Sequence, residues 1–339
     1  QIFGTEKLVK NITIDDLTPA DQAAFQKGYL QRSQQRDRSD RPIVTFFPNL
    51  EDYDSLDQLG RIMFYFGMFA LAEKEAETRG AVMLVYALGK VDLAKFVRKR
   101  NIQVLQRMDD ALPHKSASFH FCFNDKLFHS AWRYVFDFGS DPEKRARCRC
   151  HVGTHQEVLY ELMTFGIPHD AVPISEDGKI KTKLLLELLD MKQVIEERTS
   201  SMSAEVARTY VLFPSRKDVL FGKGRRLQSH PGNISLKHRV DDMLSSYESL
   251  NKQGKTDLAD TVVDTLKAKG GRFLSQDNGV WMETTDEIAR SKVAQMFRNR
   301  RKILAKSSSD VPSTVASSRK SPITEEFTGV TDSKRLRTQ

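Results

Sequence analysis

Two cysteines, a histidine and three arginines lie within the ten residues RARCRCHVGT at 145–154. Thiolates and imidazoles are zinc ligands, and clustered guanidinium groups bind phosphate. Zinc sites usually take cysteines as C-x2-C pairs from a tight turn, whereas Cys148 and Cys150 are separated by one residue. The only other cysteine is Cys122. This spacing argues against a metal site, and we expect no metal and no cofactor.

The same spacing is typical of a β-strand over 146–153, in which alternate side chains point to opposite faces. The two cysteines would then share one face, as small thiols in the core. Arg147, Arg149 and His151 would share the other face. That face could line an anionic pocket or lie in solvent, and the sequence leaves both alternatives open.

Strand and helix patterns alternate along the first half of the chain. The β-prone segments lie at 42–47, 81–88, 116–123 and 146–153. Helical patterns lie at 56–78, with Gly80 as the stop, and at 92–110, 126–138 and 156–164. Strands separated by helices imply βαβ units, so we predict an α/β fold with a mainly parallel sheet flanked by helices.

Composition shifts predict five segments. These are a polar N-terminal segment (1–37), the α/β domain (38–180), a helical linker (181–213), a small basic α+β domain (214–306) and a disordered tail (307–339). The Ser-rich stretch RTSSMSAE (198–205) marks the boundary between the two domains.

The small domain reads as two helices (233–250 and 255–269), a hairpin turning at Asp277-Asn278-Gly279, and a helix from 284 to 306. We expect Asn233 or Ser235 to cap the first of these helices. The expected core is Val262, Val263, Leu266, Phe273, Trp281, Ile288, Val293 and Phe297.

Positive charge is concentrated in this small domain. Residues 214–306 hold 19 Lys/Arg and 11 Asp/Glu, a net charge of +8 that equals the net charge of the whole chain. Helices and a hairpin with excess positive charge suit a nucleic-acid duplex. The expected phosphate contacts are Lys223, Arg225, Arg226, Arg272, Arg298, Arg300, Arg301 and Lys302. An anionic membrane surface, a nuclear import signal and a solvated helix end are the alternatives.

The motifs of nucleotide binding and catalysis are incomplete. Gly222-Lys223-Gly224 does not complete a phosphate-binding loop of the G-x-x-x-x-G-K-[ST] type. His230 has no visible nucleophile or acid partner. We therefore predict no catalytic residues and a protein that is not an enzyme.

Several motifs between 38 and 175 resemble the CRAL-TRIO family of lipid carriers. They are Asp40-Arg41-Pro42 before a strand, RGAVMLVYALGKVDLAKF (79–96), LPHKSASFHFCFNDKLFHSAWRYVFDF (112–138) and RARCRCHVGTHQEVLYELMTFGIP (145–168), in the order of the family. The resemblance implies a hydrophobic cavity that is gated by the helix at 126–138.

Side-chain periodicity agrees with such a cavity. Phe119, Phe121 and Phe123 share a strand face, and an apolar stripe follows at helical spacing. The expected lipid-binding residues are Phe119, Phe121, Phe123, Leu127, Phe128, Trp132, Val135 and Phe136. An acyl chain buried there would gain about 25 cal/mol per Å² of apolar surface. The alternative is an ordinary aromatic core.

Residues 218–302 resemble an uncharacterised domain family found mainly in predicted algal proteins. The segments that carry the resemblance are DVLFGKGRRLQSHPGN, KTDLADTVVDTLKAKGGRFL, GVWME and ARSKVAQMFRNRR. This resemblance indicates a domain boundary and implies no activity.

Together these features predict a non-enzymatic protein with a lipid-binding domain and a nucleic-acid-binding domain, a combination that could form a regulator. A peripheral lipid-transfer protein that contacts anionic membranes, or a scaffold with a closed cavity, is the alternative. We expect an intracellular protein of the cytoplasm or nucleus, because no signal peptide is visible and the most apolar run, 62–72, is too short to cross a bilayer. The sequence does not indicate an oligomeric state.

Overall fold

Four of the five strands in the first domain run parallel, in the order β1-β2-β3-β4-β5, and β1 pairs antiparallel with β2 at the edge. The computed structural model describes residues 12–49, 53–87, 115–124, 129–130, 142–199, 210–222 and 224–309. The strands are β1 (Leu30–Arg36), β2 (Pro42–Phe46), β3 (Ala81–Ala87), β4 (Ser116–Phe123) and β5 (Cys148–Val152). The prediction of an α/β fold with a mainly parallel sheet is confirmed. The predicted helices at 92–110 and 126–138 lie outside the described residues.

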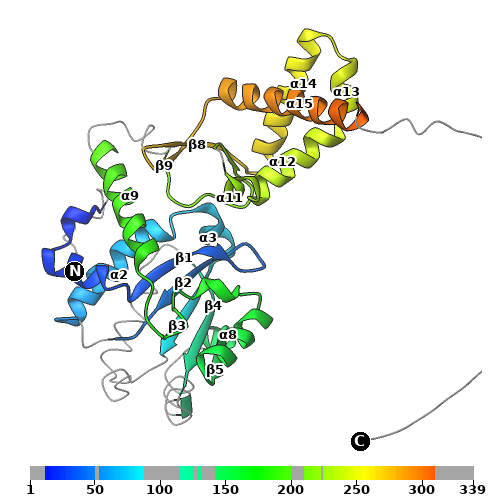
Figure 1. The fold of residues 1–339 in the computed structure, drawn as a ribbon. Helices are drawn as coiled ribbons and strands as arrows, with labels where there is room; N and C mark the ends of the chain where they lie inside the picture. Colours follow the sequence, from blue (N-terminus) through cyan, green and yellow to red (C-terminus); the bar gives the residue numbers. More distant parts are fainter. Residues whose placement is uncertain are drawn as a thin grey trace, which may run out of the picture.

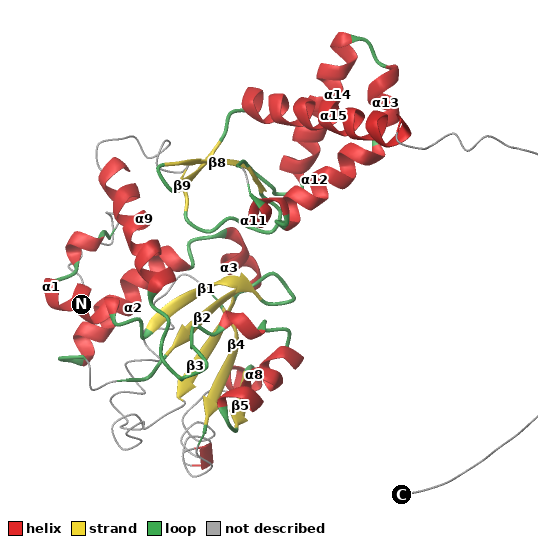
Figure 2. Cartoon of the chain, in the orientation of Figure 1, coloured by secondary structure: helices red, strands yellow, loops and turns green. Residues whose placement is uncertain are grey.

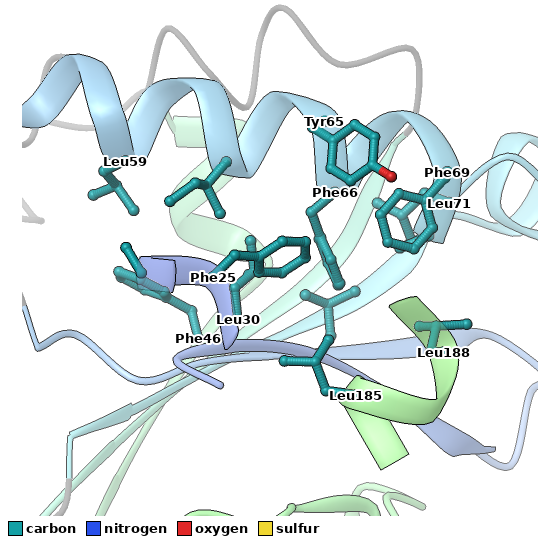
Figure 3. Packing of buried hydrophobic residues seen from close by; sticks show 14 of the residues in the cluster. Phe25, Leu30, Phe46, Leu59, Tyr65, Phe66, Phe69, Leu71, Leu185 and Leu188 are labelled. Carbon is teal, nitrogen blue, oxygen red and sulfur yellow. The ribbon is translucent and has the colours of Figure 1, made fainter. Parts of the chain in front are cut away.

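Helices cover both faces of this sheet (Figure 1). Apolar residues of α1 (Pro19–Gln26), α2 (Leu56–Ala70) and α9 (Lys183–Thr199) pack together on one face. Figure 3 shows part of this cluster, with Phe25 between Leu59 and Phe66, and with Leu185 and Leu188 on α9. α8 (His155–Thr164) packs on the other face through Val158, Leu159 and Leu162. Shorter helical elements are η2 (Ile14–Asp16), α3 (Lys74–Arg79), α7 (Pro142–Ala146) and η4 (His169–Ala171).

The predicted single helix at 56–78 is two helices. Ser55 caps α2 by accepting a hydrogen bond from the amide of Gln58, and Glu73 stands at the N-cap of α3. The predicted stop at Gly80 is confirmed. Its φ is +77°, and a Cβ there would lie 2.7 Å from the carbonyl oxygen of Lys115, so glycine is required.

The prediction of a polar N-terminal segment up to residue 37 is wrong for the described residues 12–37, which belong to the first domain. β1 reads as polar because it carries Arg32 and Arg36, yet both side chains are buried. Glu73 accepts hydrogen bonds from both guanidinium groups, at 2.8 Å from Arg32 and at 2.7 and 3.0 Å from Arg36. A buried charge is tolerated when it is paired in this way.

The segment predicted as a helical linker (181–213) contains the helix α9, but its described residues are divided between the two domains. α9 belongs to the first domain, because Leu185, Leu188 and Leu189 are buried in its core. β6 (Tyr210–Val211) pairs with β9 and therefore belongs to the second domain.

The second domain is a four-stranded sheet with helices, in the strand order β6-β9-β8-β7. Its further strands are β7 (Val219–Leu220), β8 (Phe273–Asp277) and β9 (Val280–Glu283), and its helices are α11 (Arg225–Gln228), α12 (Pro231–Asp242), α13 (Leu244–Ser249), α14 (Lys252–Ala268) and α15 (Asp286–Ser309). The predicted hairpin is confirmed, with Asn278 and Gly279 at positive φ in a two-residue turn. The predicted helix at 233–250 is two helices, α12 and α13.

Most of the predicted core of this domain is buried. Val262, Val263, Phe273, Val293 and Phe297 are buried, and Leu266 and Trp281 are partly buried. Ile288 is 52% exposed, so its assignment to the core is wrong. The buried stripe of α15 starts one residue later and runs through Ala289, Val293 and Phe297, which follow one another at helical spacing.

The two domains contact each other. The guanidinium carbon of Arg32 lies 3.6 Å from the ring centroid of Phe213, just after β6. Arg198 on α9 pairs with Asp277 at the hairpin, with 2.9 Å between their charged atoms. Figure 2 shows β8 and β9 on the side of the second domain that faces α9 and β1. No helix in the described part of the chain is both long enough and apolar enough to cross a membrane.

Candidate functional site

The three phenylalanines of β4 form a ladder on one face of the sheet. Adjacent rings, Phe119 with Phe121 and Phe121 with Phe123, are nearly parallel, with centroids 6.3 and 6.4 Å apart. Phe121 and Phe123 are buried, Phe119 is partly buried, and all three contact the cluster beneath α2. The predicted common face is therefore confirmed.

The other predicted lipid-binding residues cannot be placed beside this ladder. Leu127, Phe128, Trp132, Val135 and Phe136 lie outside the described residues. The hydrophobic cavity between the ladder and the helix at 126–138 therefore remains a prediction.

The alternation predicted for 146–153 is confirmed in β5. Cys148 and Cys150 pack with the cluster beneath α2, while His151 is buried on the opposite face, against Phe165. Burial also raises the pKa of Cys122 on β4, so this thiol is protonated and is a poor nucleophile. Within the described ranges, no group of three or more His, Cys, Asp or Glu side chains is arranged to hold a metal ion.

Two histidines that were not expected to contact each other lie side by side on this opposite face of the sheet. The rings of His120 and His151 are stacked, and His120 Nδ1 lies 2.9 Å from His151 Nε2. Because these nitrogens bond to each other, they do not converge on a common ion. Burial, followed by the nearby His151, Arg149 and Arg41, lowers the pKa of His120 to about 3. His120 is therefore neutral near pH 7 and is joined to His151 by a buried hydrogen bond on this face of the sheet.

Asp218 organises the start of the second domain. Its side chain is fully buried, and its carboxylate accepts hydrogen bonds from the amide of Ser215 and from the amide, Nε and Nη2 of Arg272, at 2.7 to 3.2 Å. Arg272, a predicted phosphate contact, is therefore held by an ion pair with a buried carboxylate, while its own side chain stays 37% exposed. The fold uses this guanidinium to join the segment before β7 to β8.

The motif HPGN at 230–233 packs against the chain at Asp218 and Leu220. The predicted capping by Asn233 or Ser235 is wrong, because α12 begins at Pro231 with His230 at the N-cap. Asn233 instead accepts a hydrogen bond from the amide of Leu220 and donates to the carbonyls of Leu220 and Leu227. A Cβ on Gly232 would lie 2.0 Å from the backbone oxygen of Asp218, so only glycine fits.

The remaining predicted phosphate contacts fall into three groups. Arg225 on α11 and Arg298, Arg301 and Lys302 on α15 are exposed. Arg300 pairs with Asp241 of α12, with Nη2 2.7 Å from Oδ2. Lys223 and the side chain of Arg226 lie outside the described residues.

Sequence analysis missed a cationic groove along α12. A cavity of about 600 Å³ is lined by Arg216, Pro231, Ile234, Ser235, His238, Arg239 and Asp242. The Nε of Arg239 is buried and has no hydrogen-bond partner among the residues that the structure describes. The spacing of Pro231, Ser235 and Arg239 places them on one helix face, a signal that was present in the sequence.

Comparison with known families bears on the second domain. A family model described as "Domain of unknown function (DUF6824)" matches residues 218–299. This match supports the predicted uncharacterised C-terminal domain, and it begins at the buried Asp218 and ends two residues after Phe297. No CRAL-TRIO match is found, and no curated protein sequence matches the chain.

Proposed function

We propose that the protein is a non-enzymatic binding protein whose second domain binds nucleic-acid duplexes through α12 and the basic end of α15. One observation carries this proposal. Arg298, Arg301 and Lys302 are exposed, and none of them has an acidic partner among the described residues. Cations that are not neutralised by the protein itself are the ones that can exchange counterions with phosphates.

Contacts within the domain support a joint surface for these cations. The ion pair between Arg300 and Asp241 holds the basic turn of α15 against the C-terminal end of α12. The α12 groove, with Arg216 and Arg239, begins on the same helix. A 12-residue helix is about 18 Å long, which is long enough to lie in or across a duplex groove.

Salt dependence tests this proposal directly. A fluorescein-labelled DNA duplex is titrated with the full chain by fluorescence anisotropy at several salt concentrations. Each lost phosphate contact lowers the slope of log K against log salt by about 0.9, so Arg301→Gln combined with Lys302→Gln should lower it by about two. The control is Lys252→Gln combined with Lys269→Gln, which removes two exposed charges from the first residue and the C-cap of α14 and should leave the slope unchanged.

Two results would overturn the nucleic-acid proposal. One is equal slopes for the α15 and α14 double variants. The other is no duplex binding at low salt together with binding to phosphatidylserine vesicles, which would indicate an anionic membrane as the partner.

We also propose, as a second function, that the first domain binds a hydrophobic ligand beside the phenylalanine ladder, as the CRAL-TRIO resemblance implies. The ladder supports this proposal because Phe119 and the two cysteines of β5 that are opposite Phe119 and Phe121, Cys148 and Cys150, are only partly buried. Native mass spectrometry of the purified chain should then detect a bound lipid at one per chain. An empty chain, even after incubation with lipid extract, would favour a scaffold with a closed interior.

A further inference from the structure

A second cavity lies in the first domain, at the amino-terminal ends of β3, β4 and β5 and on the face away from the phenylalanine ladder. Its volume is about 300 Å³. It is lined by Asp37, Arg38, Ser39, Arg41, Val82, Ala117, Ser118, His120, Ala146, Arg147, Arg149, Phe165 and Ile167. Four arginines therefore face one small space, with one acidic side chain among the lining residues.

Three of these guanidinium groups are held in place. Arg41 Nε donates to Asp37 at 2.9 Å. Arg147 donates to the carbonyl of Ser116 at 3.2 Å and pairs with Glu143. Arg149 donates to two backbone carbonyls at its own end of β5, at 2.7 and 3.0 Å. A guanidinium group has five N–H donors, so each of the three keeps donors for a ligand.

The side chain of Arg38 packs against Gly166 and lines the cavity. Its amide donates to the carbonyl of Gly166 at 2.9 Å. A Cβ on Gly166, where φ is +81°, would lie 2.4 Å from Cγ of Arg38. The missing side chain at the end of α8 thus makes room for the Arg38 stem.

The acid in the cavity is already neutralised. Asp37 is buried and accepts hydrogen bonds from the amides of Ser39 and Arg41, at 2.9 and 2.7 Å, and from the Arg41 side chain. The imidazole of His120 forms part of the wall. Its pKa is lowered mainly by burial, then by His151, and after these by the nearby Arg149 and Arg41. The electrostatic imbalance in this cavity therefore favours an anion.

We propose that this cavity binds the phosphate group of a phosphomonoester. A phosphate dianion has three oxygens and accepts bidentate hydrogen bonds from arginine. The volume is at the lower end of the range for small-molecule sites, so the cavity fits a phosphate with a small attached group rather than a nucleic-acid strand. The apolar side of the cavity, Phe165 and Ile167, would contact that group.

Isothermal titration calorimetry with glycerol 3-phosphate and the full chain tests the proposal. We expect saturable binding at one site per chain. Arg149→Gln and Arg41→Gln should each weaken it by about tenfold or more, because each removes a charge-assisted bond. Arg145→Gln removes the same charge from a position that does not line the cavity, and it should change the affinity by less than about twofold.

Among the described residues, the Arg149 side chain bonds to backbone carbonyls, and it is exposed, so its variant should fold, which the melting temperature would verify. NMR provides an independent signal, because a bound phosphate should raise the pKa of His120. Absence of saturable binding, equal weakening by Arg145→Gln and Arg149→Gln, or an unchanged His120 titration would each overturn the proposal.

A phosphomonoester can come from solution or from a lipid. Vesicles that contain phosphatidic acid present the same group at a membrane surface. Binding of glycerol 3-phosphate alone would identify a soluble ligand, whereas Arg149-dependent binding of the vesicles would identify a lipid headgroup. The duplex assay of the second domain is a separate measurement, so failure of either proposal leaves the other intact.

Discussion

Replacement of Asp218 by alanine should unfold the second domain at much lower denaturant concentration than the wild type. The carboxylate is 0% exposed and accepts four hydrogen bonds, two of them from the Arg272 side chain. The variant leaves two backbone amides without their acceptor and Arg272 without its counter-charge. Because unpaired groups of this kind are costly when buried, every lost bond contributes to the destabilisation.

The expected loss of stability depends on how exposed Arg272, the partner of Asp218, is. Removing one member of a buried ion pair costs about 3–5 kcal/mol. The Arg272 side chain is 37% exposed and can regain water, so we expect a value near the lower end, about 3 kcal/mol. Asp218→Asn keeps one carbonyl oxygen as an acceptor and should fall between the wild type and Asp218→Ala.

Urea unfolding followed by tryptophan fluorescence measures this difference. The chain has two tryptophans, so a Trp132→Phe background leaves Trp281 in β9 as the reporter of the four-stranded sheet. With a slope of about 1–3 kcal/mol/M, the midpoint should fall by about 1–3 M.

A matched variant in the same domain is Asp260→Ala. Asp260 also pairs with an arginine, Arg290, at 3.4 Å, but the two side chains are 39% and 38% exposed. An exposed pair contributes about 0.2–1 kcal/mol, so this midpoint should barely move. Equal shifts for Asp218→Ala and Asp260→Ala would refute the argument that burial of the carboxylate sets the cost.

Three further predictions test the fold assignments. Gly232→Ala should destabilise the second domain by about 3 kcal/mol or more, because its Cβ would overlap a backbone oxygen. Ser235→Ala, on the exposed face of the same helix, should change stability by less than about 0.5 kcal/mol in the same fluorescence assay. Leu188→Ala should cost the first domain about 2–5 kcal/mol if α9 belongs to its core, and the exposed Leu184→Ala should cost little, as measured by circular dichroism during urea unfolding. The pKa of His120 is about 3 in the folded chain and about 6.5 when unfolded. Its contribution to stability is therefore complete above pH 6.5 and is lost as the pH falls toward 3. His120→Asn should flatten this part of the curve of unfolding free energy against pH.

Local patterns predicted the central strands and the hairpin. The alternation of phenylalanine with His120 and Cys122 along 116–123 requires a two-faced strand, which the structure confirms as β4. The turn at Asn278-Gly279 needs two residues at positive φ, a conformation that these residue types favour. Such features depend on a few neighbouring residues, and the sequence displays them directly.

Elements that depend on distant partners were not predictable in the same way. β1 lacks an apolar alternation because its arginines are neutralised by Glu73, about forty residues away. The leucines of α9 would look the same on a linker helix as on a core helix. Only the three-dimensional contacts show that both elements belong to the first domain.

The candidate sites also combine residues that the sequence pattern indicated with residues that only the fold brings together. The face of Arg147, Arg149 and His151 was visible in the sequence, but Arg38 and Arg41 come from a loop more than 100 residues earlier and join it only in the fold. Arg272 was predicted as a phosphate contact from its charge, and the structure shows that this charge is already paired with Asp218. Sequence can list charged residues but does not show which of them are neutralised internally.

The difference between net charge and local pairing decides where anions can bind. Residues 1–213 hold 29 Lys/Arg and 30 Asp/Glu, which suggests no attraction for anions. However, Glu73 is engaged by Arg32 and Arg36, and Asp21 by Arg61, so these acids do not offset the arginines of the cavity. In the second domain Asp218 and Asp241 pair with Arg272 and Arg300, and these acids do not offset Arg298, Arg301 and Lys302. The two phosphate sites that we propose therefore differ in how their cations are paired. Arg298, Arg301 and Lys302 have no acidic partner among the described residues, whereas Arg41 and Arg147 are paired with Asp37 and Glu143 and would offer a phosphate only their remaining donors.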